Sequence, residues 1–143
     1  FLCIEEIYTV AAPAICERFG LNEAAAIARA PLLHQSSRPT AWADWFAAEG
    51  LSTAGAYSGS RFDQFSMIAE AAVAGMGVAL MPRFMIETEL ASNRLALLTG
   101  RPLDAGKAYW FVYPEAKVRT RLVRSFGAWL KTEAATPSTP AFA

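Results

Sequence analysis

The stretch Phe62–Pro82, FDQFSMIAEAAVAGMGVALMP, decides the fold of this chain. Its first half has apolar residues at helical spacing and ends at a glycine: Phe65, Ile68, Ala69, Ala72, Val73 and then Gly75. We expect Asp63 to cap this helix through the backbone N–H of Ser66. Its second half, Gly77–Met81, carries no polar side chain and is typical of a strand buried on both faces. A helix followed by such a strand predicts a sheet covered by helices.

The same alternation extends in both directions from this stretch. Strands are predicted at 7–12, 95–98 and 109–113, with a short extended segment at 31–34, a weaker strand candidate at 54–57 and a loop at 59–62. Helices are predicted at 14–19 after Pro13, at 24–30 with Asn22 as N-cap, at 41–49 with Thr40 as N-cap, from Pro82 to about 89, and at 118–132. The sequence therefore predicts an α/β fold with helices on both faces of the sheet.

In the last predicted helix, four apolar residues are expected to face inward: Leu122, Phe126, Trp129 and Leu130. Residues 135–143 contain two prolines among small residues and are expected to be a disordered tail.

Composition limits the function of the segment. The 143 residues contain 13 Lys+Arg and 13 Asp+Glu, and this zero net charge argues against a phosphate-binding surface for nucleic acid. The two cysteines, Cys3 and Cys16, are too few for a disulfide scaffold, so we expect buried, reduced thiols and a cytoplasmic location. No apolar run approaches a membrane span, and no signal peptide opens the chain. Because the chain starts at Phe1 without Met, we expect it to be part of a longer protein.

The start of the helix after Asp63 is the leading candidate for a binding site. Such an end presents unpaired backbone N–H groups and about half a positive charge, and in open α/β sheets it faces the crevice where ligands bind. This geometry would put Gln64, Phe65 and Ser66 at the mouth of a crevice. The alternative is a well-capped helix with no ligand. The polar loop His34–Ser37 leaves a predicted strand and either donates hydrogen bonds to a ligand or is simply solvated.

Several classes of enzyme are excluded by residue order and spacing. Gly75-Met76-Gly77 ends a helix, whereas a dinucleotide site needs glycines between a strand and the following helix. The only histidine, His34, has no serine elbow to serve, and no Cys, His, Asp or Glu cluster has metal-ligand spacing. We therefore predict a protein that is not an enzyme, with no catalytic residue, no metal and no cofactor. The aromatic residues Trp42, Trp45 and Phe46 belong either to the core or to a contact with a partner chain.

At this point the chain resembles the LysR-type transcriptional regulators. Four blocks carry the resemblance, in order and with the family's spacing: Ala30–His34 followed by Trp42, Trp45-Phe46 and Gly50-Leu51; Phe62–Pro82; Tyr109–Pro114 (YWFVYP); and Phe126–Leu130 (FGAWL). The match covers about residues 1 to 134 and is similar in character to the branch that contains the glycine-cleavage activator.

The resemblance implies a fold like type II periplasmic binding proteins, with two Rossmann-like subdomains joined by two crossover strands. Residues 1–110 would be mostly regulatory subdomain II. Residues 111–134 would be a crossover strand and a C-terminal helix that return to subdomain I. The DNA-binding segment would lie outside this chain.

The resemblance also implies a function. Family members bind a small effector, commonly carboxylate or amino-acid-like, in the cleft between subdomains. By position, the effector-binding residues would be Ala11, Ala12, His34, Gln35, Ser36, Ser37, Gln64, Phe65, Ser66 and Pro82. A homodimer or tetramer would form through the regulatory domains, with Trp42, Trp45, Ala54 and Tyr57 at the interface. The alternative is an extracytoplasmic solute-binding lobe of a transporter system, which would share the fold.

Overall fold

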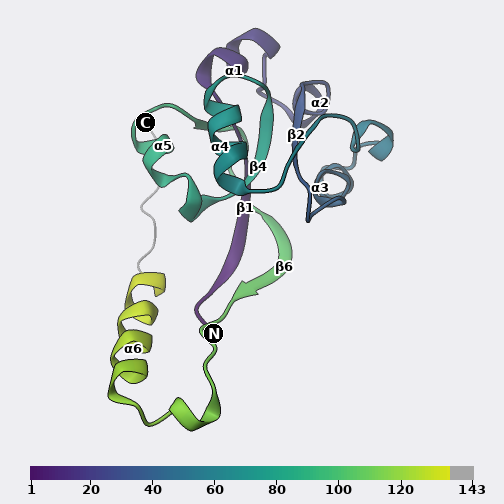
Figure 1. The fold of residues 1–143 in the computed structure, drawn as a ribbon. Coiled ribbons are helices and arrows are strands. Elements are labelled where there is room, and N and C mark those ends of the chain that lie inside the picture. Colours follow the sequence, from purple (N-terminus) through teal and green to yellow (C-terminus); the bar gives the residue numbers. More distant parts are fainter. Residues whose placement is uncertain (136–143) are drawn as a thin grey trace. The chain divides into compact units, whose positions relative to one another are not determined.

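The computed structural model describes residues 1–135 and divides into two compact units. The large unit is Glu6–Leu103, and the small unit combines Phe1–Glu5 with the chain from Asp104 onward. Figure 1 traces the elements of both units. The predicted tail at 135–143 lies outside the described residues, except for Ala135, which is the last residue of a helix.

The helices and strands alternate along the chain. They are β1 (Cys3–Ala11), α1 (Pro13–Phe19), α2 (Ala24–Ile27), β2 (Leu32–Gln35), α3 (Ala41–Ala48), the 3-10 helix η1 (Thr53–Gly55), β3 (Ser60–Phe62), α4 (Phe65–Val73), β4 (Val78–Pro82), the 3-10 helix η2 (Arg83–Met85), α5 (Glu87–Ala91), β5 (Ala96–Leu97), β6 (Leu103–Tyr109), the 3-10 helix η3 (Glu115–Lys117) and α6 (Arg121–Ala135).

The strands form one sheet in the order β3-β2-β4-β1-β5, and β6 also pairs with β1. β2 is parallel to both β3 and β4, while β1 is antiparallel to β4 and β5. The predicted α/β architecture is confirmed. The sheet is mixed because β1 runs antiparallel to β4 and β5, whereas β2, β3 and β4 are parallel to one another.

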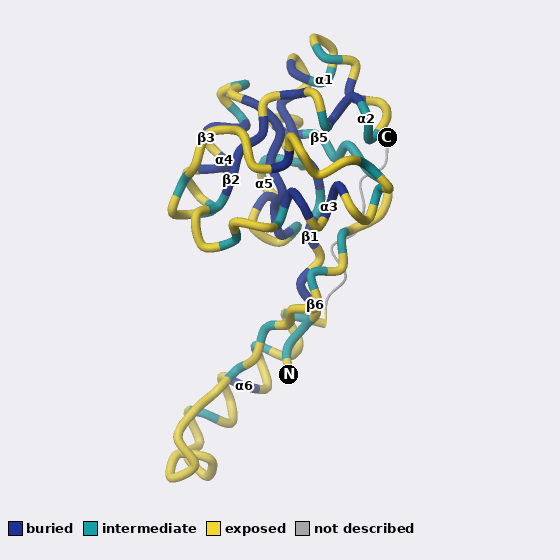
Figure 2. Tube along the Cα trace, turned by 90° about the vertical axis from the view of Figure 1, so that its right-hand side faces the viewer, coloured by how far each residue is buried: buried dark blue, intermediate teal, exposed yellow. Residues whose placement is uncertain are grey.

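Helices cover both faces of this sheet. The connection from β2 to β3 and the connection from β3 to β4 move in opposite directions along it, so right-handed crossings put α3 and α4 on opposite faces. On the α4 face, Ile68 packs in one cluster with Val10, Leu33 and Met81, each 0–2 % exposed. In Figure 2 the buried residues are gathered in the large unit.

Local signals placed several boundaries correctly. Pro13 is the first residue of α1, where its missing N–H costs nothing, and Gly20 ends that helix in the left-handed conformation at φ 58°. The helix and buried strand predicted within Phe62–Pro82 are α4 and β4, and Gly75 (φ 76°) follows α4 as expected.

The predictions around β3 were wrong. Residues 54–57 lie in and after the 3-10 helix η1, and the predicted loop 59–62 contains the edge strand β3. β3 exists because Ser60–Phe62 pairs with Leu33–Gln35 of β2, and this pairing leaves no periodic pattern in so short and exposed a segment.

Two predicted caps were also wrong. The N-cap of α4 is Gln64, not Asp63, and the N-cap of α2 is Glu23, not Asn22; neither helix start has a side-chain cap hydrogen bond. The carbonyl oxygen of Asp63 accepts a 3.0 Å hydrogen bond from Gln35 Nε2, and this contact holds Asp63 in the turn before the helix.

In the small unit, the predicted strand 109–113 was displaced. The observed strand β6 ends at Tyr109, because its pairing with β1 ends there: the Leu2 amide donates a 2.8 Å hydrogen bond to the Tyr109 carbonyl. The Tyr109 hydroxyl also donates to the buried carboxylate of Glu5, so the two strands are joined through side chains as well.

Three of the apolar residues predicted to face inward from the last helix, Leu122, Phe126 and Trp129, are exposed, so this prediction was wrong for them. In α6, Leu122 is 76 % exposed, Phe126 46 % and Trp129 54 %, although the ring of Phe111 lies edge-on to that of Phe126 at 5.5 Å; Leu130 is partly buried. Cys3 and Cys16 are free thiols, as predicted, but both are partly rather than fully buried. Within residues 1–135, no helix is long and apolar enough to cross a membrane.

Candidate effector site

One edge of the large unit's sheet gathers most of the predicted binding residues. β2, β3 and β4 are parallel, so their carboxyl ends, at Gln35, Phe62 and Pro82, meet at the same edge. Loops that leave such an edge are where ligands bind in open α/β sheets. The segment Ser36–Ser37 and the start of α4 both follow it.

Gln35 organises this edge through three hydrogen bonds. Its Nε2 donates to the Asp63 carbonyl at 3.0 Å, and its Oε1 accepts from the Ser37 amide at 2.7 Å and from the Ser37 hydroxyl at 2.5 Å. The Ser36 amide donates to the Phe62 carbonyl at 2.8 Å. The loop after β2 is therefore tied to the turn that leads into α4.

The start of α4 presents polar groups at the same edge. Gln64 is exposed and extended, and Ser66 Oγ lies 3.5 Å from Gln64 Oε1. Phe65 is partly buried, and the guanidinium carbon of Arg38 lies 4.9 Å from its ring centroid. With no side chain capping the helix, its first backbone N–H groups have no side-chain acceptor.

His34 is next to this edge but faces the interior. It is 2 % exposed, and its Nε2 lies 2.9 Å from the Ser58 carbonyl oxygen. This contact connects β2 to the segment before β3. In this structure His34 therefore has a structural partner and contributes no exposed group to the edge.

Ala11 and Ala12 are not brought together with the other residues. β1 is antiparallel to β4, with Ile7 opposite Pro82 and Val10 opposite Ala79. The carboxyl end of β1 therefore lies at the amino end of β4, on the opposite edge of the sheet. Both alanines are also buried, at 0 % and 7 % exposure. The sequence carries no sign of this reversal of strand direction.

Sequence reasoning predicted Pro82 at the carboxyl edge but missed two residues near it, Arg83 and Tyr8. Pro82 is buried at the end of β4, and Arg83 follows it directly. The guanidinium carbon of Arg83 lies 5.8 Å from the ring centroid of Tyr8 on β1. The sequence did offer a signal for Arg83, a cation immediately after a predicted buried strand. The neighbourhood of Tyr8 could not be predicted, because it depends on the pairing of β1 with β4.

The residues predicted for a dimer interface divide by burial. Trp42 and Trp45 are 1 % and 3 % exposed, and their rings pack edge-on at 5.5 Å with Phe46 beside them. Of the two alternatives for these aromatic residues, they therefore belong to the core. Their side chains have no surface to offer a second chain. Ala54 and Tyr57 are exposed, Tyr57 by 52 %.

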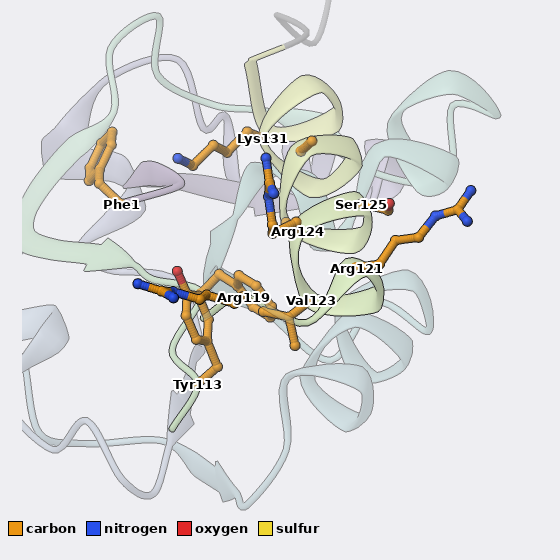
Figure 3. Close-up of a pocket in the computed structure, with 11 residues that line it drawn as sticks. Phe1, Tyr113, Arg119, Arg121, Val123, Arg124, Ser125 and Lys131 are labelled. Atoms are coloured by element: carbon orange, nitrogen blue, oxygen red, sulfur yellow. The ribbon is translucent and has the colours of Figure 1, made fainter. Parts of the chain in front are cut away.

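A pocket of about 910 Å³ lies in the small unit, and none of the predicted effector residues lines it. Figure 3 shows its lining, which combines the aromatic rings of Phe1, Phe111 and Tyr113 with four cations and no carboxylate: Arg119, Arg121, Arg124 and Lys131. It lies against α6, the helix whose apolar side chains are exposed. None of the hydrogen-bonded groups described above belongs to its lining.

Within the described part of the chain, no group of three or more His, Cys, Asp or Glu side chains is arranged to hold a metal ion.

Comparison with known proteins identifies the family. The model of the LysR substrate binding domain matches residues 1–135. The chain belongs to this family. The predicted relationship to LysR-type regulators is thereby confirmed.

Curated relatives of this LysR domain are transcriptional regulators, not enzymes. The chain is 34 % identical over 137 residues to the HTH-type transcriptional regulator TrpI of Pseudomonas aeruginosa. The aligned region covers 94 % of this chain and 45 % of TrpI. It is 28 % identical over 109 residues to the glycine cleavage system transcriptional activator of Escherichia coli K12, covering 76 % of the chain and 35 % of that activator. The chain thus spans about half the length of TrpI and less of the activator. These relatives do not favour the transporter alternative.

Solved structures show the same LysR effector-domain fold. The effector domain of AmpR from Pseudomonas aeruginosa matches with a TM-score of 0.80 and 27 % identity, over 94 % of this chain and 63 % of that one. The AmpR effector binding domain from Citrobacter freundii matches with a TM-score of 0.79 and 28 % identity, over 94 % and 66 %. The predicted type II periplasmic-binding-protein-like fold is confirmed.

Proposed function

We propose that this chain is the effector-sensing regulatory domain of a LysR-type DNA-binding transcriptional regulator. The observation that carries the proposal is the edge at which Gln35 ties the Ser36–Ser37 loop to the start of α4. This arrangement holds polar groups from two loops in fixed positions, which is what a small ligand needs to be recognised in one orientation.

The ligand that suits this edge is a small metabolite with a carboxylate, as in a carboxylic acid or an amino acid. The first N–H groups of α4 have no side-chain cap, and a helix start with free N–H groups favours an anion. The Ser66 hydroxyl can donate to the same oxygens and Gln64 offers an amide, while Ser37, whose hydroxyl donates to Gln35 Oε1, holds the loop in place. Gln35, Ser36 and Phe65 complete the proposed site, with Pro82 beside it.

Signal transfer needs the rest of the regulator. We infer that residues 1–110 are mostly regulatory subdomain II and that 111–134 return to subdomain I, whose remaining residues cover the exposed apolar face of α6. Effector binding then shifts the balance between two arrangements of the protein, by no more than the difference in its affinity for them. DNA is bound by a segment outside this neutral chain, and the regulator acts in the cytoplasm.

The regulator is proposed to form a homodimer or tetramer through its regulatory domains. Within this chain, the exposed side chain of Tyr57 and the exposed Ala54 supply the surface, and the buried residues Trp42 and Trp45 support it from inside. Sedimentation of the full-length protein tests this: Tyr57→Asp is expected to weaken association, whereas Thr88→Asp, at an exposed position on α5, serves as the matched control. Equal association of both variants and the native protein would reject the surface.

Calorimetry of the full-length protein against small carboxylates and amino acids tests the sensing site. We expect saturable binding of at least one of them, with affinity reduced about tenfold or more by Ser66→Ala or Gln64→Ala. Ser52→Ala, whose hydroxyl contacts Ala54 on another loop, is the control. If the responsive ligand binds equally well to all three variants, the site assignment is wrong.

A further inference from the structure

Arg83 has a polar atom that is buried without a partner. It begins η2 directly after β4, its side chain is partly buried, and its Nε is enclosed but makes no hydrogen bond. Among the residues that the structure describes, the ring of Tyr8 is the group recorded against it, 5.8 Å from the guanidinium carbon.

Three other arginines of the large unit are paired. Arg61 donates to the Tyr57 carbonyl at 3.0 Å, while Arg94 and Arg101 contact Glu89 and Glu49 at 2.7 Å and 3.1 Å. A guanidinium is always charged and has five N–H donors, so a buried donor without an acceptor is unfavourable in the folded state. Arg83 is therefore the guanidinium of this unit whose enclosed donor lacks an acceptor.

Arg83 lies at the edge where the proposed effector site is found. β2 and β4 are parallel neighbours, with Leu33 opposite Ala79, so the Ser36–Ser37 loop and Arg83 both leave the sheet at the same edge. Neighbouring strands are about 4.8 Å apart. On the other side, β1 brings Tyr8 opposite Met81, two residues before Arg83. Arg83 therefore follows a strand whose two neighbours are β1, which carries Tyr8, and β2, which leads into the Ser36–Ser37 loop.

We propose that Arg83 binds the carboxylate of the effector, with the ring of Tyr8 orienting its guanidinium plane. The inference rests on the proposed function and makes it more specific. A guanidinium can donate two parallel hydrogen bonds to one carboxylate, and this planar match distinguishes an acid from its amide. An amide would direct its own NH₂ donors at the donors of Arg83, so the site selects against it. The effector is accordingly an organic anion.

The first test observes Arg83 itself with acetate as the minimal carboxylate. In the full-length protein labelled with ¹⁵N-arginine, the Nε–H signal of Arg83 is identified by its loss in Arg83→Gln. We expect acetate to shift this signal in a saturable manner, and acetamide to leave it unchanged. Arg29, exposed on the opposite edge of the sheet before β2, is the internal control and should not respond. A shift no larger than that of Arg29 would overturn the proposal.

The same spectrum distinguishes a carboxylate that belongs to the protein. If a Glu or Asp outside residues 1–135 occupies Arg83, its Nε–H is already protected and does not respond to acetate. That result would also overturn a role in effector binding, and it would identify Arg83 as part of an internal ion pair.

The second test uses the responsive acid from the calorimetric panel. Arg83→Gln should lower its affinity about tenfold or more, Arg83→Lys should restore part of it, and Arg29→Gln should leave it unchanged. Without ligand, the Tm of Arg83→Gln should fall only slightly, because Nε has no hydrogen bond to lose and only the contact with the Tyr8 ring is removed. A purely structural arginine would give a clearly lower Tm. Binding that depends on Gln64 and Ser66 but not on Arg83 would refute this inference while leaving the proposed function intact. If Arg83 responds to acetate but Gln64→Ala and Ser66→Ala have no effect on binding, the proposed site at the start of α4 is refuted, while the role of Arg83 stands.

Discussion

The indole Nε1–H of Trp42 donates a 2.9 Å hydrogen bond to the backbone carbonyl of Leu33. The bond joins α3 to β2, the strand that carries Gln35 and the serine loop. It also explains why this tryptophan lies inside the large unit: the ring packs with Trp45 and Phe46, and its one polar atom finds an acceptor in the sheet.

Trp42→Phe should lower the free energy of unfolding by about 1–3 kcal/mol, because the Leu33 carbonyl loses a buried donor and the smaller ring leaves space unfilled. Urea denaturation followed by circular dichroism measures this change. Trp129→Phe, at a side chain 54 % exposed, should alter stability by no more than about 0.5 kcal/mol. Equal losses in the two variants would contradict the buried role of Trp42.

Gly59→Ala should destabilise the large unit by about 1–3 kcal/mol or more. Gly59 has φ 138°, and a Cβ there would overlap the carbonyl oxygen of Leu32 and lie 3.0 Å from the ring of His34. Gly100→Ala is the matched control, since a Cβ at that position has nothing within 4 Å. Thermal unfolding of the two variants provides the comparison, and a fully tolerated Gly59→Ala would refute the close approach of this turn to β2.

Gln35→Ala should reduce the hydrogen-exchange protection of the Ser37 amide by roughly two- to tenfold, because that amide donates to Gln35 Oε1. The Ser36 amide donates instead to the Phe62 carbonyl, so its protection should be retained. Exchange measured by NMR resolves the two neighbours within one sample. Loss of protection at both amides would mean that the substitution unfolds the edge as a whole rather than freeing the loop.

Burial raises the pKa of the Cys16 thiol, and Glu17 contributes in the same direction by repelling the thiolate. Because the folded-state pKa is raised, the protonated Cys16 thiol favours the folded protein. This contribution to the free energy of unfolding is fully present below the thiol pKa of the unfolded chain and is lost as pH rises through the folded-state pKa. In a Cys3→Ser background, the midpoint for alkylation by iodoacetamide should therefore lie above that of the protein unfolded in urea. A midpoint at or below the unfolded value would contradict this burial.

Predictions that depended on local spacing were the accurate ones. The apolar residues from Phe65 to Val73 and the run after Gly77 indicated α4 and β4, because helical and strand periodicity are properties of neighbouring residues. The caps and the edge strand β3 were missed, since they depend on partners far away in the sequence: Gln35 for Asp63, and Leu33–Gln35 for Ser60–Phe62.

The sequence by itself determined the family, the alternation of helices and strands, and the two polar segments at the carboxyl edge, Gln35–Ser37 and Gln64–Ser66. Only the tertiary structure decided that β1 runs against β4, which puts Ala11 and Ala12 on the far edge and brings Tyr8 beside Arg83. The physical reason is that strand direction is set by pairing between segments that lie far apart in the chain. No pattern within either strand records which way its partner runs.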